Sequence, residues 1–162
     1  MKNIICALLL LATASNFTRA EEAKRDYGFE HIEDLRLDGY EFKFTKAGPA
    51  DKDGYQWGYF KFRWKGNKPV RLWGFGFEKD GSFSPRFETF SKKLKGAWAE
   101  VKVGYCGTGA ETYTLDPNKD YVFKIALEQH AEDADQWVVK LDGEKISVVS
   151  EPFNVTTNKE NR

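Results

Sequence analysis

The residue best suited to covalent chemistry is Cys106, which lies in the glycine-rich stretch G-Y-C-G-T-G at positions 104–109. A cysteine nucleophile needs a base that removes its proton, and only His31 and His130 are available in this chain. Neither histidine lies in a motif that pairs it with a thiol. We therefore expect Cys106 to be a free thiol that packs as a small apolar side chain. An intermolecular disulfide and a catalytic role are the alternatives.

Metal coordination is the second chemistry that the residue types allow. The stretch 128–135 carries His130 and several carboxylates, and oxygen ligands suit Ca²⁺. Its spacing matches no calcium loop, and Asp51 and Asp53 lack the further acidic positions of an EF-hand. Two histidines and Cys106 lie too far apart in sequence to form a convincing zinc set. We expect both stretches to be solvated loops, and we predict no metal and no cofactor.

The sequence carries no signature of the common catalytic sites. It lacks a phosphate-binding loop, a dinucleotide fingerprint and a G-x-S-x-G nucleophile elbow. A pair of carboxylates for glycoside hydrolysis is not excluded by the sequence, because the distance between the two groups depends on the fold. With no catalytic pair to name, we predict that the chain is not an enzyme.

Aromatic side chains are abundant and offer a non-covalent chemistry, with 13 Phe, 7 Tyr and 5 Trp in 162 residues. Flat rings can stack on sugar rings, and Trp57, Tyr59 and Trp73 are the candidates for such contacts. They belong to an aromatic hairpin over 55–77, in which Gly74 and Gly76 alternate with aromatic residues. Alternating rings in sandwich proteins mostly face the opposite sheet, so core packing is the competing interpretation for this hairpin.

Strands must position these residues, because apolar side chains recur with a period of two along most of the chain. Turn residues such as Asp142-Gly143 separate the alternating segments. The segment 83–94 is expected to be an irregular crossing loop, and no helix longer than one turn is predicted. The expected strands are 40–45, 55–64, 70–77, 97–105, 111–115, 121–127, 136–141 and a last strand over 146–155 that is interrupted at Glu151-Pro152.

Leu115, Pro117 and Tyr121 form an L-x-P-x-x-x-Y pattern just before one of these strands. The pattern resembles the tyrosine corner of fibronectin-type-III and related immunoglobulin-like domains. That resemblance implies a two-sheet antiparallel β-sandwich in which the hydroxyl of Tyr121 bonds the backbone near 115–118. We therefore expect an all-β, immunoglobulin-like fold.

A looser resemblance covers residues 55–127. The segment N-K-P-V-R-L-W-G at 67–74, followed by Trp98, C-G-T-G at 106–109 and the L-x-P corner, is similar to a group of uncharacterised secreted bacterial proteins. This resemblance brings no known activity with it.

The N-terminus reads as a secretory signal over residues 1–20. Lys2 precedes an apolar core at 4–14, and cleavage is expected after Ala20, with Ala14 as the alternative site. The apolar core is too short for a resident membrane helix, and Cys6 is expected to be discarded with it. An N-terminal arm over 21–39, a sandwich domain over 40–156 and a polar tail over 157–162 would follow.

Removing residues 1–20 takes away Lys2 and Arg19, so 23 basic residues face 25 acidic ones and the net charge is about −2. This charge disfavours nucleic acid and anionic membrane as partners. We predict a secreted or periplasmic, non-catalytic interaction or structural module whose partner is a protein or a glycan. The alternative function is a carbohydrate-binding module that uses exposed aromatic residues.

Overall fold

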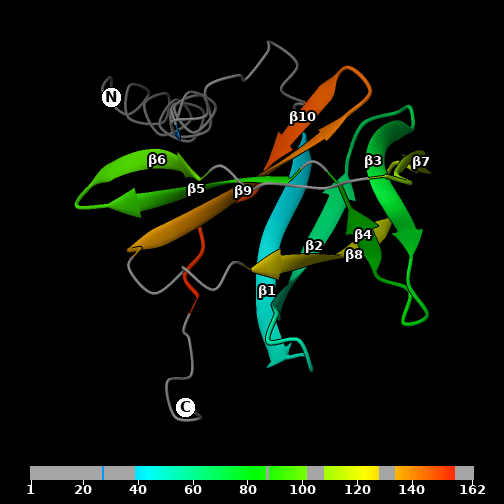
Figure 1. Cartoon of the computed structure of the whole chain (residues 1–162). Helices are drawn as coiled ribbons and strands as arrows, with labels where there is room; N and C mark the ends of the chain where they lie inside the picture. Colours follow the sequence, from blue (N-terminus) through cyan, green and yellow to red (C-terminus); the bar gives the residue numbers. More distant parts are fainter. Residues whose placement is uncertain (1–26, 28–38, 87, 102–107, 128–133, 156–162) are drawn as a thin grey trace, which may run out of the picture.

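The computed structural model describes residues 27, 39–86, 88–101, 108–127 and 134–155 (Figure 1). These residues contain strands and turns but no helix, which confirms the all-β prediction. Accordingly, none of the described residues belongs to a helix long and apolar enough to cross a membrane. The strands are β1 (Tyr40–Ala50), β2 (Gln56–Trp64), β3 (Val70–Phe77), β4 (Phe83–Pro85), β5 (Glu88–Leu94), β6 (Ala97–Val101), β7 (Glu111–Leu115), β8 (Asp120–Leu127), β9 (Gln136–Gly143) and β10 (Ile146–Val149).

All ten strands belong to one hydrogen-bonded sheet that curls into a half-barrel. The order along the sheet is β1-β2-β8-β4-β3-β9-β5-β6, with β10 beside β9 and β7 beside β3. Figure 1 shows the curl, because β1 and β2 run across the direction of β5, β6 and β9. The expectation of purely antiparallel pairing is wrong at one place, since β4 and β8 pair in parallel through Phe83 and Phe123.

The core lies on the concave side of the half-barrel, and phenylalanine is its most frequent residue. Alternation along β2 and β8 turns Phe60, Phe62 and Phe123 inward, and each has no exposed surface. The rings of Phe62 and Phe123 stack with their centroids 4.8 Å apart. Burial of apolar side chains such as these is the dominant favourable term in folding.

Glycine in β3 makes room for one of these rings. A Cβ atom built on Gly74 would lie 2.3 Å from Cζ of Phe83 and 2.8 Å from the carbonyl oxygen of Ser84. The alternate glycines of this strand therefore face the core. Gly74 leaves room for a neighbouring ring and close backbone, as predicted, and the close approach of β4 depends on it.

The end of β10 and the residues that follow it connect the C-terminal part of the sheet to the edge strand β1. The hydroxyl of Tyr40 donates to the carbonyl of Val149 and accepts from its N–H, both at 2.9 Å. The N–H of Glu151 donates to the carbonyl of Phe42 at 2.8 Å. These contacts cover the edge of β1, which would otherwise present unpaired backbone groups.

A second, smaller cluster lies on the other side of the sheet. Tyr27, only 8% exposed, packs edge-on against Trp98 at 5.0 Å between ring centroids and contacts the buried Val138. Its carbonyl accepts a hydrogen bond from the hydroxyl of the fully buried Ser91. This part of the predicted N-terminal arm is thus docked on β5, β6 and β9.

Several predicted segments differ from the structure. The first strand, predicted over 40–45, runs on to Ala50. The predicted turn residues Asp142-Gly143 belong to β9 and pair with β10, so the hairpin turn lies at Glu144-Lys145. The stretch 83–94, expected to be an irregular loop, forms β4 and the inner strand β5, which pairs with both β6 and β9. The last predicted strand ends at Val149, and beyond Pro152 only a single bridge joins Phe153 to Trp137. The predicted signal, most of the arm and the polar tail lie outside the described residues.

Candidate functional site

Two of the predicted binding residues lie side by side on the convex, outward face of β2. Trp57 and Tyr59 occupy alternate positions there and are half-buried, while the intervening Gly58 faces the core. Strand β8 lies on one side of them, with Ala126 opposite Trp57 and Lys124 opposite Tyr59.

A hydrogen bond from the β1–β2 hairpin fixes the position of the Trp57 ring. The indole Nε1–H donates to Oδ2 of Asp51 at 3.0 Å. The other carboxylate oxygen of Asp51 accepts from the backbone N–H groups of Asp53 at 2.9 Å and Tyr55 at 3.0 Å. The Trp57 bond, followed by these backbone bonds, holds the pKa of Asp51 below its usual range. The charged Asp51 therefore links the hairpin loop to the aromatic face through hydrogen bonds.

Lysine side chains flank both rings. The ammonium of Lys124 lies 4.7 Å from the centroid of Trp57 and 2.6 Å from Oε2 of Glu78. The hydrogen bond to Glu78 raises the pKa of Lys124. On the side of β1, Lys46 lies 5.3 Å from the Tyr59 centroid. The Tyr59 ring leans over Gly48, where a Cβ atom would come within 3.0 Å of it.

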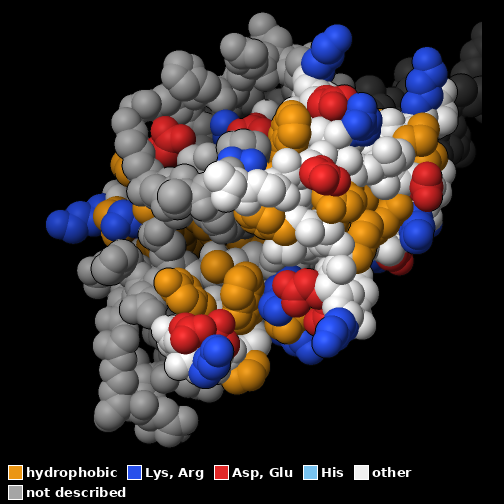
Figure 2. Space-filling model, turned by 45° about the vertical axis from the view of Figure 1, so that its right-hand side comes forward, with side chains coloured by type: hydrophobic (Ala, Val, Ile, Leu, Met, Phe, Trp, Pro, Cys, Tyr) orange, Lys and Arg blue, Asp and Glu red, His pale blue; other side chains and the backbone are white. Residues whose placement is uncertain are grey.

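Trp73, the third predicted binding residue, is not brought to this place. It lies on the outward face of β3, half-buried and opposite Thr112 of β7, with β8 and β4 between β2 and β3. Its neighbours Phe75 and Phe77 are 44% and 50% exposed. Core packing therefore holds for Phe60 and Phe62 but not for Trp73 and Phe75 on the outward face of β3. Phe77 is half exposed, yet its ring still contacts the buried Phe83 at 5.2 Å between centroids. Figure 2, which brings the side of β3 and β7 forward, shows hydrophobic side chains interspersed among charged ones.

The predicted corner residues lie at the junction between β7 and β8. The hydroxyl of Tyr121 accepts a 2.8 Å hydrogen bond from the backbone N–H of Asp116, which is the kind of bond that the L-x-P-x-x-x-Y pattern predicts. Tyr121 is 6% exposed and Leu115 is fully buried, while Pro117 lies in the turn between them. These three residues have a structural role at the β7–β8 junction and lie apart from the aromatic face of β2.

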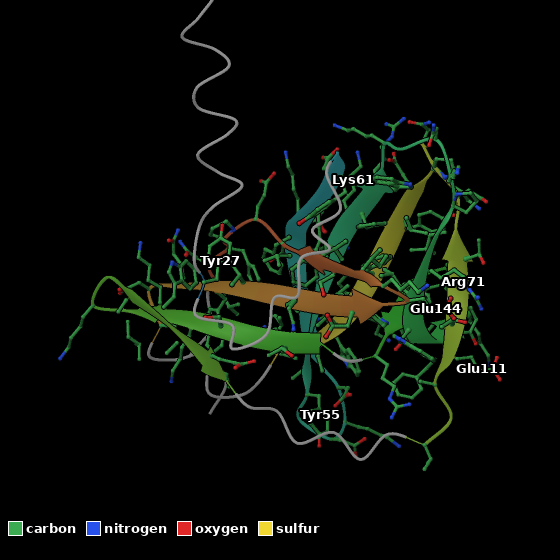
Figure 3. All side chains as sticks on the ribbon, turned by 90° about the horizontal axis from the view of Figure 1, so that it is seen from above. Tyr27, Tyr55, Lys61, Arg71, Glu111 and Glu144 are labelled. Carbon is green, nitrogen blue, oxygen red and sulfur yellow. The ribbon has the colours of Figure 1, made fainter. Side chains whose placement is uncertain are left out.

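Opposite charges are interleaved along the rest of the β1–β2–β8 face. Lys61 lies 3.6 Å from Asp120, Arg63 lies 3.6 Å from the same carboxylate, and Lys43 lies 3.2 Å from Glu151. A separate ion pair, away from this face, joins Arg71 of β3 to Glu144 in the β9–β10 turn at 2.9 Å (Figure 3). The face around Trp57 and Tyr59 thus carries many charges but no block of one sign.

Sequence reasoning missed Asp51 and Lys124 as parts of this face. Asp51 was considered only as a calcium ligand, although a carboxylate six positions before a tryptophan across a hairpin loop could have suggested an indole partner. No local signal links Lys124 to Trp57, because the register between β2 and β8 brings them together.

The candidates for covalent chemistry and metal binding lie in parts of the chain that the structure does not describe. Cys106, His31 and His130 lie outside the described residues, as does most of the acidic stretch 128–135. Within the described part of the chain, no group of three or more His, Cys, Asp or Glu residues is arranged to hold a metal ion.

Comparison with known proteins adds no relative: no family model, no curated protein and no solved structure matches the chain. The likeness to fibronectin-type-III and immunoglobulin-like domains therefore stays a prediction from the corner pattern.

Proposed function

We propose that this chain is an exported, non-catalytic interaction module that binds its partner through the outward face of β2. The observation that carries the proposal is the placement of Trp57 and Tyr59 next to each other on the convex side, held by Asp51, Lys124 and Lys46. Partly exposed rings that are fixed in place lose little entropy on binding and are favoured at recognition surfaces.

The proposal includes a relationship to immunoglobulin-like sandwiches. In it, the β1–β2–β8 part and the β9–β5–β6 part of the half-barrel correspond to the two sheets, and the bond from Asp116 to Tyr121 is the tyrosine corner. Secretion or a periplasmic location, with cleavage after Ala20, completes the proposal and is supported by the sequence of residues 1–20.

Affinity capture from the envelope fraction of the source cells tests the interaction function. The mature chain 21–162 is immobilised beside a Trp57→Ala, Tyr59→Ala double variant and a Phe75→Ala control, since Phe75 is an exposed ring on another strand. We expect a ligand that the wild type and the control retain and that the double variant loses. Equal retention by all three proteins would contradict the proposal.

Carbohydrate binding is the second candidate function. It is favoured by the hydrogen-bonding groups that border the rings, because sugar recognition combines ring stacking with polar contacts to hydroxyl groups. Asp51 and the Lys124–Glu78 pair supply such groups next to Trp57.

A further inference from the structure

The aromatic face of β2 extends beyond the two residues singled out by the sequence. Tyr55 precedes β2 by one residue, lies at the β1–β2 hairpin (Figure 3) and is 53% exposed. Trp57 and Tyr59 share the outward face of β2, and Tyr55 lies two positions before Trp57 at the end of the hairpin loop. We call these three residues the β2 aromatic row. Residues two apart in a strand are about 6.7 Å apart, so the row spans about 13 Å. That length suits several linked sugar units better than one.

Hydrogen bonds within the β1–β2 hairpin position two residues of the row. Asp51 joins two of its members, because one carboxylate oxygen accepts from the N–H of Tyr55 and the other from the indole of Trp57. The carbonyl of Tyr55 in turn accepts from the N–H of Asp51 at 2.8 Å. The indole bond is made at the edge of the ring, and the ammonium of Lys124 lies over one face of it, which leaves the other face for a ligand. The hairpin thus fixes the Trp57 ring and the backbone of Tyr55 relative to each other before any ligand arrives.

Charge around the row indicates which ligands it suits. The nearest fixed cation, Lys124, is neutralised by Glu78 at 2.6 Å, and Asp51 adds a negative charge beside Trp57. Lys46 adds a positive charge at Tyr59. A surface with balanced charges gives no net attraction to a polyanion, whereas ammonium and carboxylate groups together can donate to and accept from hydroxyl groups.

We propose that the β2 aromatic row binds a neutral, linear glycan that lies along β2, with its sugar rings stacked on Tyr55, Trp57 and Tyr59. Hydroxyl groups of the glycan bond Asp51 and the Lys124–Glu78 pair. This inference rests on the proposed interaction function and specifies its ligand class and contact residues.

Affinity electrophoresis of the mature chain through gels that contain single polysaccharides tests the inference. The neutral set is β-glucan, xylan, mannan and glycol chitin, and the acidic set is alginate, polygalacturonate and heparin. We expect at least one neutral polysaccharide to retard the protein more strongly than any acidic one. Tyr55→Ala and Tyr59→Ala should each weaken the affinity about tenfold, the loss expected when one stacked ring is removed. Phe75→Ala should leave it unchanged.

The outcomes separate this inference from the function beneath it. No retardation by any neutral polysaccharide overturns the glycan ligand, and the envelope capture experiment then decides the interaction function independently. Retardation by acidic polysaccharides alone overturns the neutral class while carbohydrate binding stands. Equal losses in Tyr55→Ala and Phe75→Ala overturn the row as the contact surface. Far-UV circular dichroism of each variant verifies that the strands are retained, and Tyr55, being exposed outside the strand, is the variant least able to disturb them.

Discussion

At the scale of single residues, burial and the position of the hydrogen-bond partner distinguish structural aromatic residues from candidate binding residues. Tyr121 is buried and its hydroxyl has a backbone donor, whereas Trp57 is half-buried and its indole is bonded from a loop. Both types of residue look alike in an alternating sequence. The sequence could name Tyr121 because a local pattern surrounds it, but it could not tell Trp57 from Trp73, since their surroundings depend on strands distant in the chain.

Removing the Tyr121 hydroxyl should destabilise the fold. Tyr121→Phe keeps the ring but leaves the N–H of Asp116 without its partner, and we expect a loss of about 1–3 kcal/mol in the free energy of unfolding. Tyr113→Phe is the matched control, because Tyr113 is half-buried and its hydroxyl makes no hydrogen bond with the described residues. Urea denaturation at unchanged m-value measures both. A larger midpoint shift for Tyr113→Phe would contradict the corner.

Acid should release the Trp57 ring through Asp51. The folded-state pKa of Asp51 is lowered, so the contribution of its carboxylate is present above the unfolded-state pKa and is lost as pH falls through the lower, folded-state pKa. Asp51→Asn keeps a carbonyl oxygen for the N–H groups of Asp53 and Tyr55 but replaces the indole acceptor with a donor. We expect an acid transition in the indole N–H resonance of Trp57 below the ordinary aspartate range, and its absence in Asp51→Asn. The same transition in both proteins would remove Asp51 as its cause.

At the scale of elements, the sequence located strands where alternation and turn residues agree. The strands 70–77 and 111–115 have the predicted bounds. The segment E-T-F-S-K-K-L, which forms β5, was not predicted as a strand, because its polar side chains are not typical of a strand that is paired on both sides. Ser91 of β5 is fully buried there, and the carbonyl of Tyr27, 64 positions earlier, satisfies its hydroxyl.

Two glycines test why β3 lies so close to β4. Gly74→Ala would push a methyl group against Phe83 and the backbone of Ser84, so we expect a loss of about 3 kcal/mol in the free energy of unfolding. Gly81→Ala meets no atom within 4 Å but has a positive φ of 80°, and it should lose only about 1 kcal/mol. Thermal unfolding of both variants ranks them. A smaller loss for Gly74→Ala would show that β4 can move away.

At the scale of the whole molecule, the curl of the sheet both encloses the core and decides which rings face outward. The convex side of β2 is outward because Phe60 and Phe62 pack inward, and β8 and β4 keep Trp73 away from it. No sequence pattern encodes this separation, because it results from the parallel pairing of β4 with β8. The site could therefore be predicted in part, as aromatic residues of one hairpin, but not as Trp57 and Tyr59 together without Trp73.

Tyr40 tests how the half-barrel is fastened at β1. Tyr40→Phe removes the hydroxyl that bonds both the N–H and the carbonyl of Val149, so we expect a loss of about 1–3 kcal/mol in the free energy of unfolding. Tyr55→Phe, an exposed tyrosine, should stay within about 0.5 kcal/mol of the wild type. Hydrogen exchange should rise at Val149 and Glu151 in Tyr40→Phe. Unchanged exchange at both amides would contradict the fastening.

The most direct test of the account is a chemical-shift titration of the ¹⁵N-labelled mature chain with an oligosaccharide from the neutral polysaccharide that binds most strongly. The Trp57 indole N–H, identified by its loss of the acid transition in Asp51→Asn, is the reporter. We predict saturable shifts at this resonance and at the amides of residues 55–59, with none at Trp73 or Phe75. Shifts centred on β3, or no shift at the Trp57 indole under saturating ligand, would contradict the claim that β2 carries the binding face.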